Sequence, residues 1–252
     1  MKPEHLSVPA WAISIDKIPA LCINYVKSII NTRQVGYKED ARIMTEITII
    51  EPARIEARSF EIITEILGNK TFPAEQQGII KRVIHTSADF DYADNLVFGH
   101  NAVKSGVAAL KAGCTVVTDT RMAFAGINQK NLSKLGAAKA CFIDDPQVME
   151  QAKAGGVTRA AMAMELAARD AKNSIFAIGN APTALLMLRD LILAGKLSPA
   201  LVVGVPVGFV NVVEAKELFM ELNVPYIVAK GRKGGSNVAA AIINALMLEA
   251  LK

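Results

Sequence analysis

Short apolar runs that alternate with helical segments constrain the fold of this chain most. Five runs are four or five residues long and contain no charged residue: 115–118, 140–143, 174–178, 200–203 and 225–229. Strands buried on both faces of a parallel sheet have this composition. Segments with helical periodicity precede, separate and follow them: 52–67, 73–87, 158–171, 182–194, 210–222 and 236–251. The pattern predicts an α/β fold, a three-layer α/β/α domain with a mostly parallel sheet of about five strands.

Three glycine-containing loops each follow a predicted strand and precede a predicted helix. They are 179–183, 204–209 and 230–236, with the sequences GNAPT, GVPVGF and KGRKGGS. In an open α/β sheet such turns meet at the carboxyl edge, where ligands bind. Glycine lets backbone N–H groups approach a ligand, and the following helix presents a partly positive N-terminus. The loops therefore predict an anion pocket, with the candidate residues Asn180, Thr183, Arg232, Lys233 and Ser236.

None of these loops has the spacing of a nucleotide-binding motif. GxGxxG is absent, and 230–236 lacks the spacing and the Gly-Lys-Ser/Thr ending of a P-loop. No Ser-His-Asp, Cys-His or metal-ligand spacing is evident either, so the sequence predicts no metal site. The three cysteines, Cys22, Cys114 and Cys141, are widely spaced and are expected to be reduced thiols.

The composition limits the classes of ligand that the protein is expected to bind. A formal charge of +4 favours small anions, whereas 6% aromatic residues and no long Lys/Arg run argue against nucleic acid. No apolar stretch reaches the roughly 18 residues of a membrane span. Residues 1–9 lack the pattern of a secretory leader, which predicts a cytoplasmic protein.

The first forty or so residues do not follow the alternation. Pro3, Pro9 and Pro19 interrupt them, although 18–30 has the pattern of a short amphipathic helix. We therefore divide the chain into an N-terminal arm, 1–45, and a domain, 46–252. The arm is expected to dock on the domain or on a partner subunit.

His85 is the histidine whose neighbours suggest chemistry. It lies near the end of the predicted helix 73–87, with Arg82 one turn before it and Asp89 about one turn after. The helix end and Asp89 favour the imidazolium and Arg82 opposes it, so His85 is suited to proton transfer near neutrality. A helix-capping histidine without catalytic function is the alternative that spacing alone favours.

Two further pairs are candidates for binding a carboxylate. Ser59 lies on the apolar stripe of helix 52–67 beside Arg58, although a buried Ser59 can also return its hydroxyl to the carbonyl of Ile55. Asp119 and Arg121 follow strand 115–118 and form either a surface pair or a substrate clamp. Their place at the carboxyl edge favours the clamp.

Six segments occur in order and at characteristic intervals: RVIHT (82–86), DFDY (89–92), TDTRM (118–122), AIGNAPTA (177–184), GVPVGFV (204–210) and GRKGGS (231–236). Together they closely resemble the precorrin-8X methylmutase family, including its cobalt-precorrin-8 branch. The likeness runs from about Ile49 to the C-terminus, and the first forty or so residues depart from the family's short N-terminus.

The resemblance implies an isomerase of cobalamin biosynthesis. It would move a methyl group from its ring-bridging attachment to the neighbouring carbon of ring C of (cobalt-)precorrin-8, giving hydrogenobyrinate or cobyrinate. Because the methyl group never leaves the substrate, no cofactor is implied. His85 matches the family's catalytic histidine, which is expected to donate and accept a proton on the macrocycle. Substrate contacts carry over to Ser59 and Arg82 and, by loop correspondence, to Arg58, Asp119, Arg121, Asn180, Thr183, Arg232 and Ser236.

The resemblance also implies a polycarboxylate corrinoid as substrate, a homodimer with the site near the subunit interface, and transfer to neighbouring pathway enzymes. A large, partly apolar macrocycle suits a mouth lined by 205–207 and Phe209. Two rival hypotheses remain: a non-catalytic corrinoid carrier, and a nucleotide- or phosphate-dependent transferase that uses loop 230–236.

Overall fold

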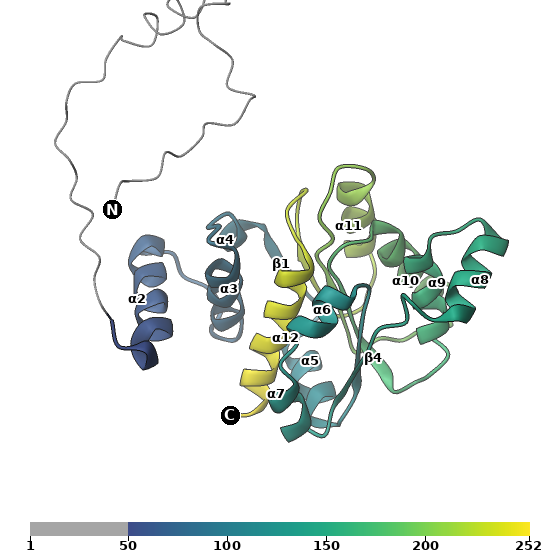
Figure 1. Ribbon diagram of the computed structural model, residues 1–252. Coiled ribbons are helices and arrows are strands. Elements are labelled where there is room, and N and C mark those ends of the chain that lie inside the picture. The colour runs from purple at the N-terminus through teal and green to yellow at the C-terminus, as the bar shows by residue number, and fades with distance from the viewer. Residues whose placement is uncertain (1–49) are drawn as a thin grey trace, which may run out of the picture. The chain divides into compact units, whose positions relative to one another are not determined.

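The computed structural model describes residues 50–252 (Figure 1). The predicted arm, its helix 18–30 and the first residues of the predicted domain lie outside the described residues. The 3-10 turn η2 (Pro52–Arg54) is followed by α2 (Ile55–Leu67), α3 (Ala74–Ser87), α4 (Tyr92–Asn95), α5 (Ala102–Lys111), α6 (Arg121–Gly126), α7 (Gln129–Lys134), α8 (Pro146–Gly155), α9 (Arg159–Ala167), α10 (Pro182–Leu193), α11 (Val212–Met220) and α12 (Ser236–Ala250). Within residues 50–252, every helix is too short or too polar to cross a membrane.

A six-stranded sheet forms the middle layer, in the order β1-β6-β5-β4-β2-β3. The strands are β1 (Leu96–Gly99), β2 (Thr115–Thr118), β3 (Ala138–Ala140), β4 (Asn173–Ile178), β5 (Leu201–Gly204) and β6 (Tyr226–Ala229). The strands from β2 to β6 pair in parallel, whereas β1 pairs antiparallel with β6 at one edge. The predicted mostly parallel sheet is confirmed, with one edge strand more than expected.

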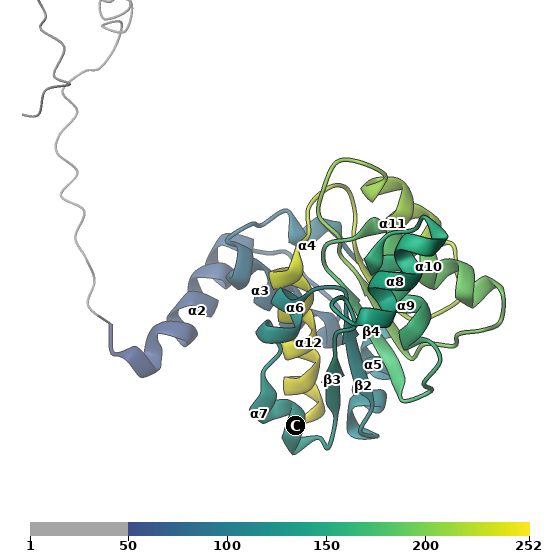
Figure 2. The ribbon, with the colours of Figure 1, turned by 45° about the vertical axis from the view of Figure 1, so that its right-hand side comes forward.

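Successive residues of β4 point to opposite faces of the sheet and join two separate cores. Ile175 and Ala177 join the core with α3, α5 and α12, whereas Phe176 and Ile178 join the core with α9, α10 and α11. All four side chains are fully buried. The predicted three-layer arrangement is therefore confirmed, with helices on both faces of the sheet (Figure 2).

Short polar side chains begin four of the helices. Thr120, Asn128, Asp145 and Thr158 each accept a hydrogen bond from a backbone N–H in the first turn of α6, α7, α8 and α9, respectively. Such caps satisfy N–H groups that have no partner inside the helix. The cap at Thr158 agrees with the predicted start of helix 158–171, but α9 already ends at Ala167.

Helix α12 is the central helix of the layer that contains α3, the helix that carries His85. Most of its side chains are buried, and it packs against α3, α5, α6 and α7. Its many alanines let neighbouring helices approach closely, as at Gly126 of α6, where an added Cβ would lie 2.8 Å from the Cβ of Ala240. Helix α3, which carries His85 in its last turn, therefore packs directly on this central helix.

Helix α2 exposes the apolar stripe that the sequence predicts on it. Ile55, Ile62 and Ile66 are exposed, and Ile63 is the buried residue of this helix. Figure 1 shows α2 on the far side of α3 from the sheet. Only one side of α2 therefore has a partner within residues 50–252, and the periodic pattern marks an apolar face that this part of the chain does not cover.

Candidate functional site

His85 lies in the last turn of α3, and its side chain is exposed. Its imidazole stacks on the ring of Phe60 from α2, with 5.2 Å between ring centroids and 24° between ring planes. The guanidinium of Arg82 also lies over this ring, 5.3 Å from its centroid, and an Arg82 Nη1 atom is 3.0 Å from Glu56 Oε1. His85 and Arg82, which the sequence places one turn apart on this helix, thus both contact the ring of Phe60.

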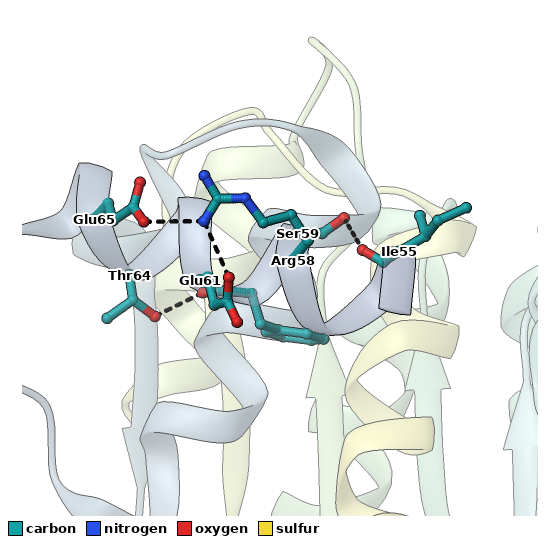
Figure 3. Close-up of polar contacts among 7 residues, drawn as sticks. Ile55, Arg58, Ser59, Glu61, Thr64 and Glu65 are labelled. Carbon is teal, nitrogen blue, oxygen red and sulfur yellow. Dashed lines mark hydrogen bonds and ion pairs between the residues drawn. The ribbon is translucent and has the colours of Figure 1, made fainter. Parts of the chain in front are cut away.

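Arg58 and Ser59 make contacts within α2 (Figure 3). Arg58 Nη1 donates to Glu61 Oε2 at 3.0 Å and to Glu65 Oε1 at 3.1 Å. Ser59 Oγ donates to the carbonyl of Ile55 at 2.9 Å, which is the purely structural alternative considered above. Neither residue joins the contacts of His85, so their contact with a substrate stays a prediction.

Lys233 connects the loop between β6 and α12 to the end of α3. Its Nζ lies 2.6 Å from Asp89 Oδ2 and 2.6 Å from Asp91 Oδ2. The hydrogen bond from Lys233 lowers the pKa of Asp89 below its usual range. Asp89 was expected to act on His85, but the structure pairs it with Lys233. The pair instead brings loop 230–235 next to the helix end that carries His85.

Ser236, which follows this loop, connects it to α6 at the carboxyl edge of the sheet. The buried hydroxyl of Ser236 lies 2.7 Å from Thr120 Oγ1, and Thr120 caps α6, which begins with Arg121. A chain of contacts therefore runs along the carboxyl edge from α3 through loop 230–235 to α6. Arg232 is exposed on this loop, and its carbonyl accepts the Gly208 N–H at 3.3 Å.

A cavity of about 490 Å³ opens beside α6. Its lining brings together four of the predicted residues, and it comprises Asp119, Thr120, Arg121, Ile143, Thr158, Arg159, Ala160, Asn180, Ala181, Pro182 and Thr183. Arg121 Nε donates to Asp144 Oδ2 at 2.8 Å, and Thr183 Oγ1 lies 2.7 Å from Thr158 Oγ1. Arg159 was not predicted from the sequence. The available signal was its position directly after Thr158, the N-cap of α9, which places it in the first turn of a helix that begins at this cavity.

Asp119 is buried beneath this cavity and shapes the loop above it. Its two oxygens accept the backbone N–H groups of Gly179 at 2.9 Å, Asn180 at 2.8 Å and Ala181 at 2.8 Å. Burial raises the pKa of Asp119 and the three N–H donors counteract part of the rise. The carboxylate is thus engaged with backbone rather than paired with Arg121, and substrate contact by Asp119 stays a prediction.

The loop between β5 and α11 carries the apolar residues expected to line the mouth. Val205 and Pro206 are buried, whereas Val207 and Phe209 are exposed, with 85% of Phe209 accessible. The adjoining Val210 is exposed too. The apolar surface at the edge therefore comes from the tip of this loop and not from its first two residues.

Within residues 50–252, no group of three or more His, Cys, Asp and Glu side chains could hold a metal ion. Cys114 and Cys141 are free thiols, and Cys22 lies outside the described residues. The site thus consists of one exposed histidine, several arginines and lysines, backbone N–H groups and an apolar loop tip. Such a set can move a proton on a large anionic ligand with an apolar face.

The chain is similar to precorrin-8X methylmutases both in sequence and in structure. The precorrin-8X methylmutase family model matches residues 54–249. The cobalt-precorrin-8 methylmutase of Priestia megaterium is 46% identical over 199 residues, which cover 79% of this chain and 88% of the relative. The enzyme of that name from Salmonella typhimurium is 46% identical over 206 residues, covering 79% and 96%. The solved structure of precorrin-8x methyl mutase from Thermus thermophilus has a TM-score of 0.73 and 38% identity, and covers 79% of this chain and 98% of that chain. The chain therefore belongs to the precorrin-8X methylmutase family, whose members are isomerases of cobalamin biosynthesis.

Proposed function

We propose that the chain moves the methyl group to ring C of cobalt-precorrin-8, with His85 as the group that donates and accepts the proton. The observation that carries the proposal is the exposed His85 imidazole at the end of α3, stacked on Phe60 and beside Arg82. An imidazole gains and loses a proton near neutral pH, and a fixed ring can serve both steps of one rearrangement. Because atoms only change places within the substrate, no donor or acceptor of electrons is needed.

The remaining residues serve substrate binding in this proposal. Arg82 lies over the Phe60 ring on which His85 stacks, Arg232 is exposed on loop 230–235, and Ser236 contacts Thr120 at the start of α6. Arg121, Asn180 and Thr183 line the cavity beside α6. Cationic and N–H donors at this edge suit the carboxylates of a corrinoid. The exposed Phe209 and Val210 offer an apolar surface to the flat face of its ring.

We take the cobalt form as the substrate because both relatives at 46% identity are named for cobalt-precorrin-8. The cobalt belongs to the substrate, and the protein handles the proton and the carboxylates. An anaerobic assay with cobalt-precorrin-8 and with metal-free precorrin-8X, following the visible spectrum, tests this assignment. We expect a higher kcat/KM with the cobalt form, and faster turnover of the metal-free form would contradict it.

Arg121→Ala is expected to raise KM about tenfold and to change kcat by less than about threefold, because the arginine binds a carboxylate remote from the migrating methyl group. Steady-state kinetics measure both constants. Arg169→Ala is the matched control, since Arg169 is exposed and outside the cavity that Arg121 lines. Equal KM values for the two variants would remove Arg121 from the binding site.

We further propose that the protein is a homodimer that buries the exposed isoleucines of α2. Ile66→Lys is expected to shift the dimer to monomer, because a charged side chain is costly to bury in an apolar interface. Leu193→Lys on α10 is a matched control, since Ile66 and Leu193 are both 60% exposed. Light scattering after size exclusion gives the mass of each variant, and a dimeric Ile66→Lys protein would exclude α2 as the interface. Docking of the arm 1–45, action in the cytoplasm and transfer of product to neighbouring pathway enzymes stay predictions.

A further inference from the structure

Lys216 on α11 is a fully buried lysine that the proposed chemistry does not use. Its Nζ donates to the carbonyl of Gly231 at 2.8 Å and to the carbonyl of Lys233 at 2.9 Å. Both acceptors belong to the loop between β6 and α12. A side chain from a neighbouring helix therefore holds this loop from the inside.

Placing an ammonium group in this position costs free energy. Burial lowers the pKa of Lys216 to about 8. Buried charged groups are retained when hydrogen bonds replace their contacts with water, and the two carbonyls do so here. An apolar residue of similar length would fill the same space without that cost. What the lysine specifically adds is its two hydrogen bonds to the loop.

The direction of these two carbonyls sets the direction of two N–H groups. In a trans peptide the C=O and the following N–H point opposite ways, and the described chain has no cis peptide. The N–H groups of Arg232 and Gly234 therefore point away from Lys216. Among residues 50–252, neither N–H donates a hydrogen bond to the backbone. Arg232 is exposed and Gly234 is half-buried, so this face of the loop is accessible to a ligand.

Two other contacts fix where this outer face lies. The Gly235 N–H donates to the carbonyl of Val205 at 2.9 Å, and the Lys233 side chain pairs with Asp89 next to the end of α3. Gly234 passes so close to Val205 that an added Cβ would lie 2.1 Å from the Val205 carbonyl oxygen. The loop thus has one packed side and one free side, and the free side lies along the edge that begins at His85.

We infer that Lys216 is a positioning residue of the substrate site, which turns the N–H groups of Arg232 and Gly234 toward a carboxylate of the substrate. The inference rests on the proposed function, because it assigns part of the binding of the same polycarboxylate ligand. Lys216 touches no substrate atom and acts through the loop alone.

Lys216→Met tests this role, with Lys139→Met as the matched control. Lys139 Nζ also donates to two carbonyls, those of Phe124 and Ile127 at 2.8 Å each, at the far end of α6 from Arg121. We expect Lys216→Met to raise KM for cobalt-precorrin-8 about tenfold with kcat changed less than about threefold, and Lys139→Met to leave both unchanged. Equal KM values for the two variants overturn the inference.

A measurement on the wild-type protein does not depend on how the variant folds. Two-dimensional amide NMR with and without cobyrinate should shift the Arg232 and Gly234 signals when the product binds. Binding that leaves both amide signals in place contradicts the inference. If the wild-type protein binds and turns over neither substrate, the proposed function itself fails, so the two failures are distinguishable.

Discussion

His85→Ala is expected to lower kcat by about 10²- to 10⁴-fold while the dissociation constant for the substrate changes by less than about threefold. The loss follows because the variant has no group at the end of α3 to give and take back the proton. Binding persists because the carboxylates of the substrate meet the arginines and loops of the edge. Single-turnover absorbance gives the rate, and fluorescence or spectral titration gives the affinity.

His100→Gln is the control for this experiment. Since β1 is antiparallel to β6, its end at Gly99 pairs with Tyr226 at the start of β6, so His100 lies at the opposite edge of the sheet. This variant should retain the wild-type rate. An active His85→Ala protein would remove His85 from the chemistry and leave the helix-capping alternative.

Asp119→Ala is expected to destabilise the domain by about 3 kcal/mol and to lower Tm by about 10 °C. The substitution removes the acceptor of three backbone N–H groups, those of Gly179, Asn180 and Ala181, in a buried position. Asp119→Asn should be destabilised too, because its amide group would place a donor against N–H donors. Denaturant unfolding measures the free energy and calorimetry measures Tm.

Asp145→Ala provides the comparison for Asp119. Asp145 Oδ1 accepts one backbone N–H, that of Gln147 at 2.8 Å, at the exposed start of α8. Loss of such a cap costs about 1 kcal/mol. A destabilisation of Asp119→Ala no larger than that of Asp145→Ala would show that the loop does not depend on the buried carboxylate.

Much of the fold was predictable because apolar runs report burial directly. The strands at 115–118 and 174–178 lie inside the sheet. Their side chains join the cores on both faces, as expected for strands that alternate with helices along the chain. The two edge strands of the sheet were harder to predict. β3 covers Ala138–Ala140 rather than 140–143, since its pairing with β2 fixes it. β1 is a four-residue strand whose place depends on β6, and such strands have little local signal.

The site was predictable where the relevant residues share one element. Spacing alone placed His85 one turn from Arg82 on α3, and the order of the loops placed Asn180 and Thr183 at one edge. The sequence did not reveal Phe60 beneath His85, because that contact depends on how α2 packs on α3. It also did not reveal that Asp119 accepts N–H groups from residues 60 or more positions away.

The burial of Lys216 is a further feature that the sequence did not reveal. Lys216 is a charged residue next to Glu217 and looks like a surface residue in the sequence, yet its side chain is fully buried. Only the path of the loop between β6 and α12 gives the side chain two carbonyl acceptors. Residues that act through a distant loop carry no local pattern, so their function is readable from the structure alone.

Following the migrating methyl group itself tests the central claim most directly. Cobalt-precorrin-8 with a ¹³C label in that methyl group is mixed anaerobically with the protein, and the visible spectrum, the product mass and the ¹³C NMR signal are recorded. We predict a new chromophore, an unchanged mass and a label that has moved to the neighbouring carbon of ring C. A bound substrate whose spectrum and label position do not change would contradict an isomerase and identify a corrinoid carrier.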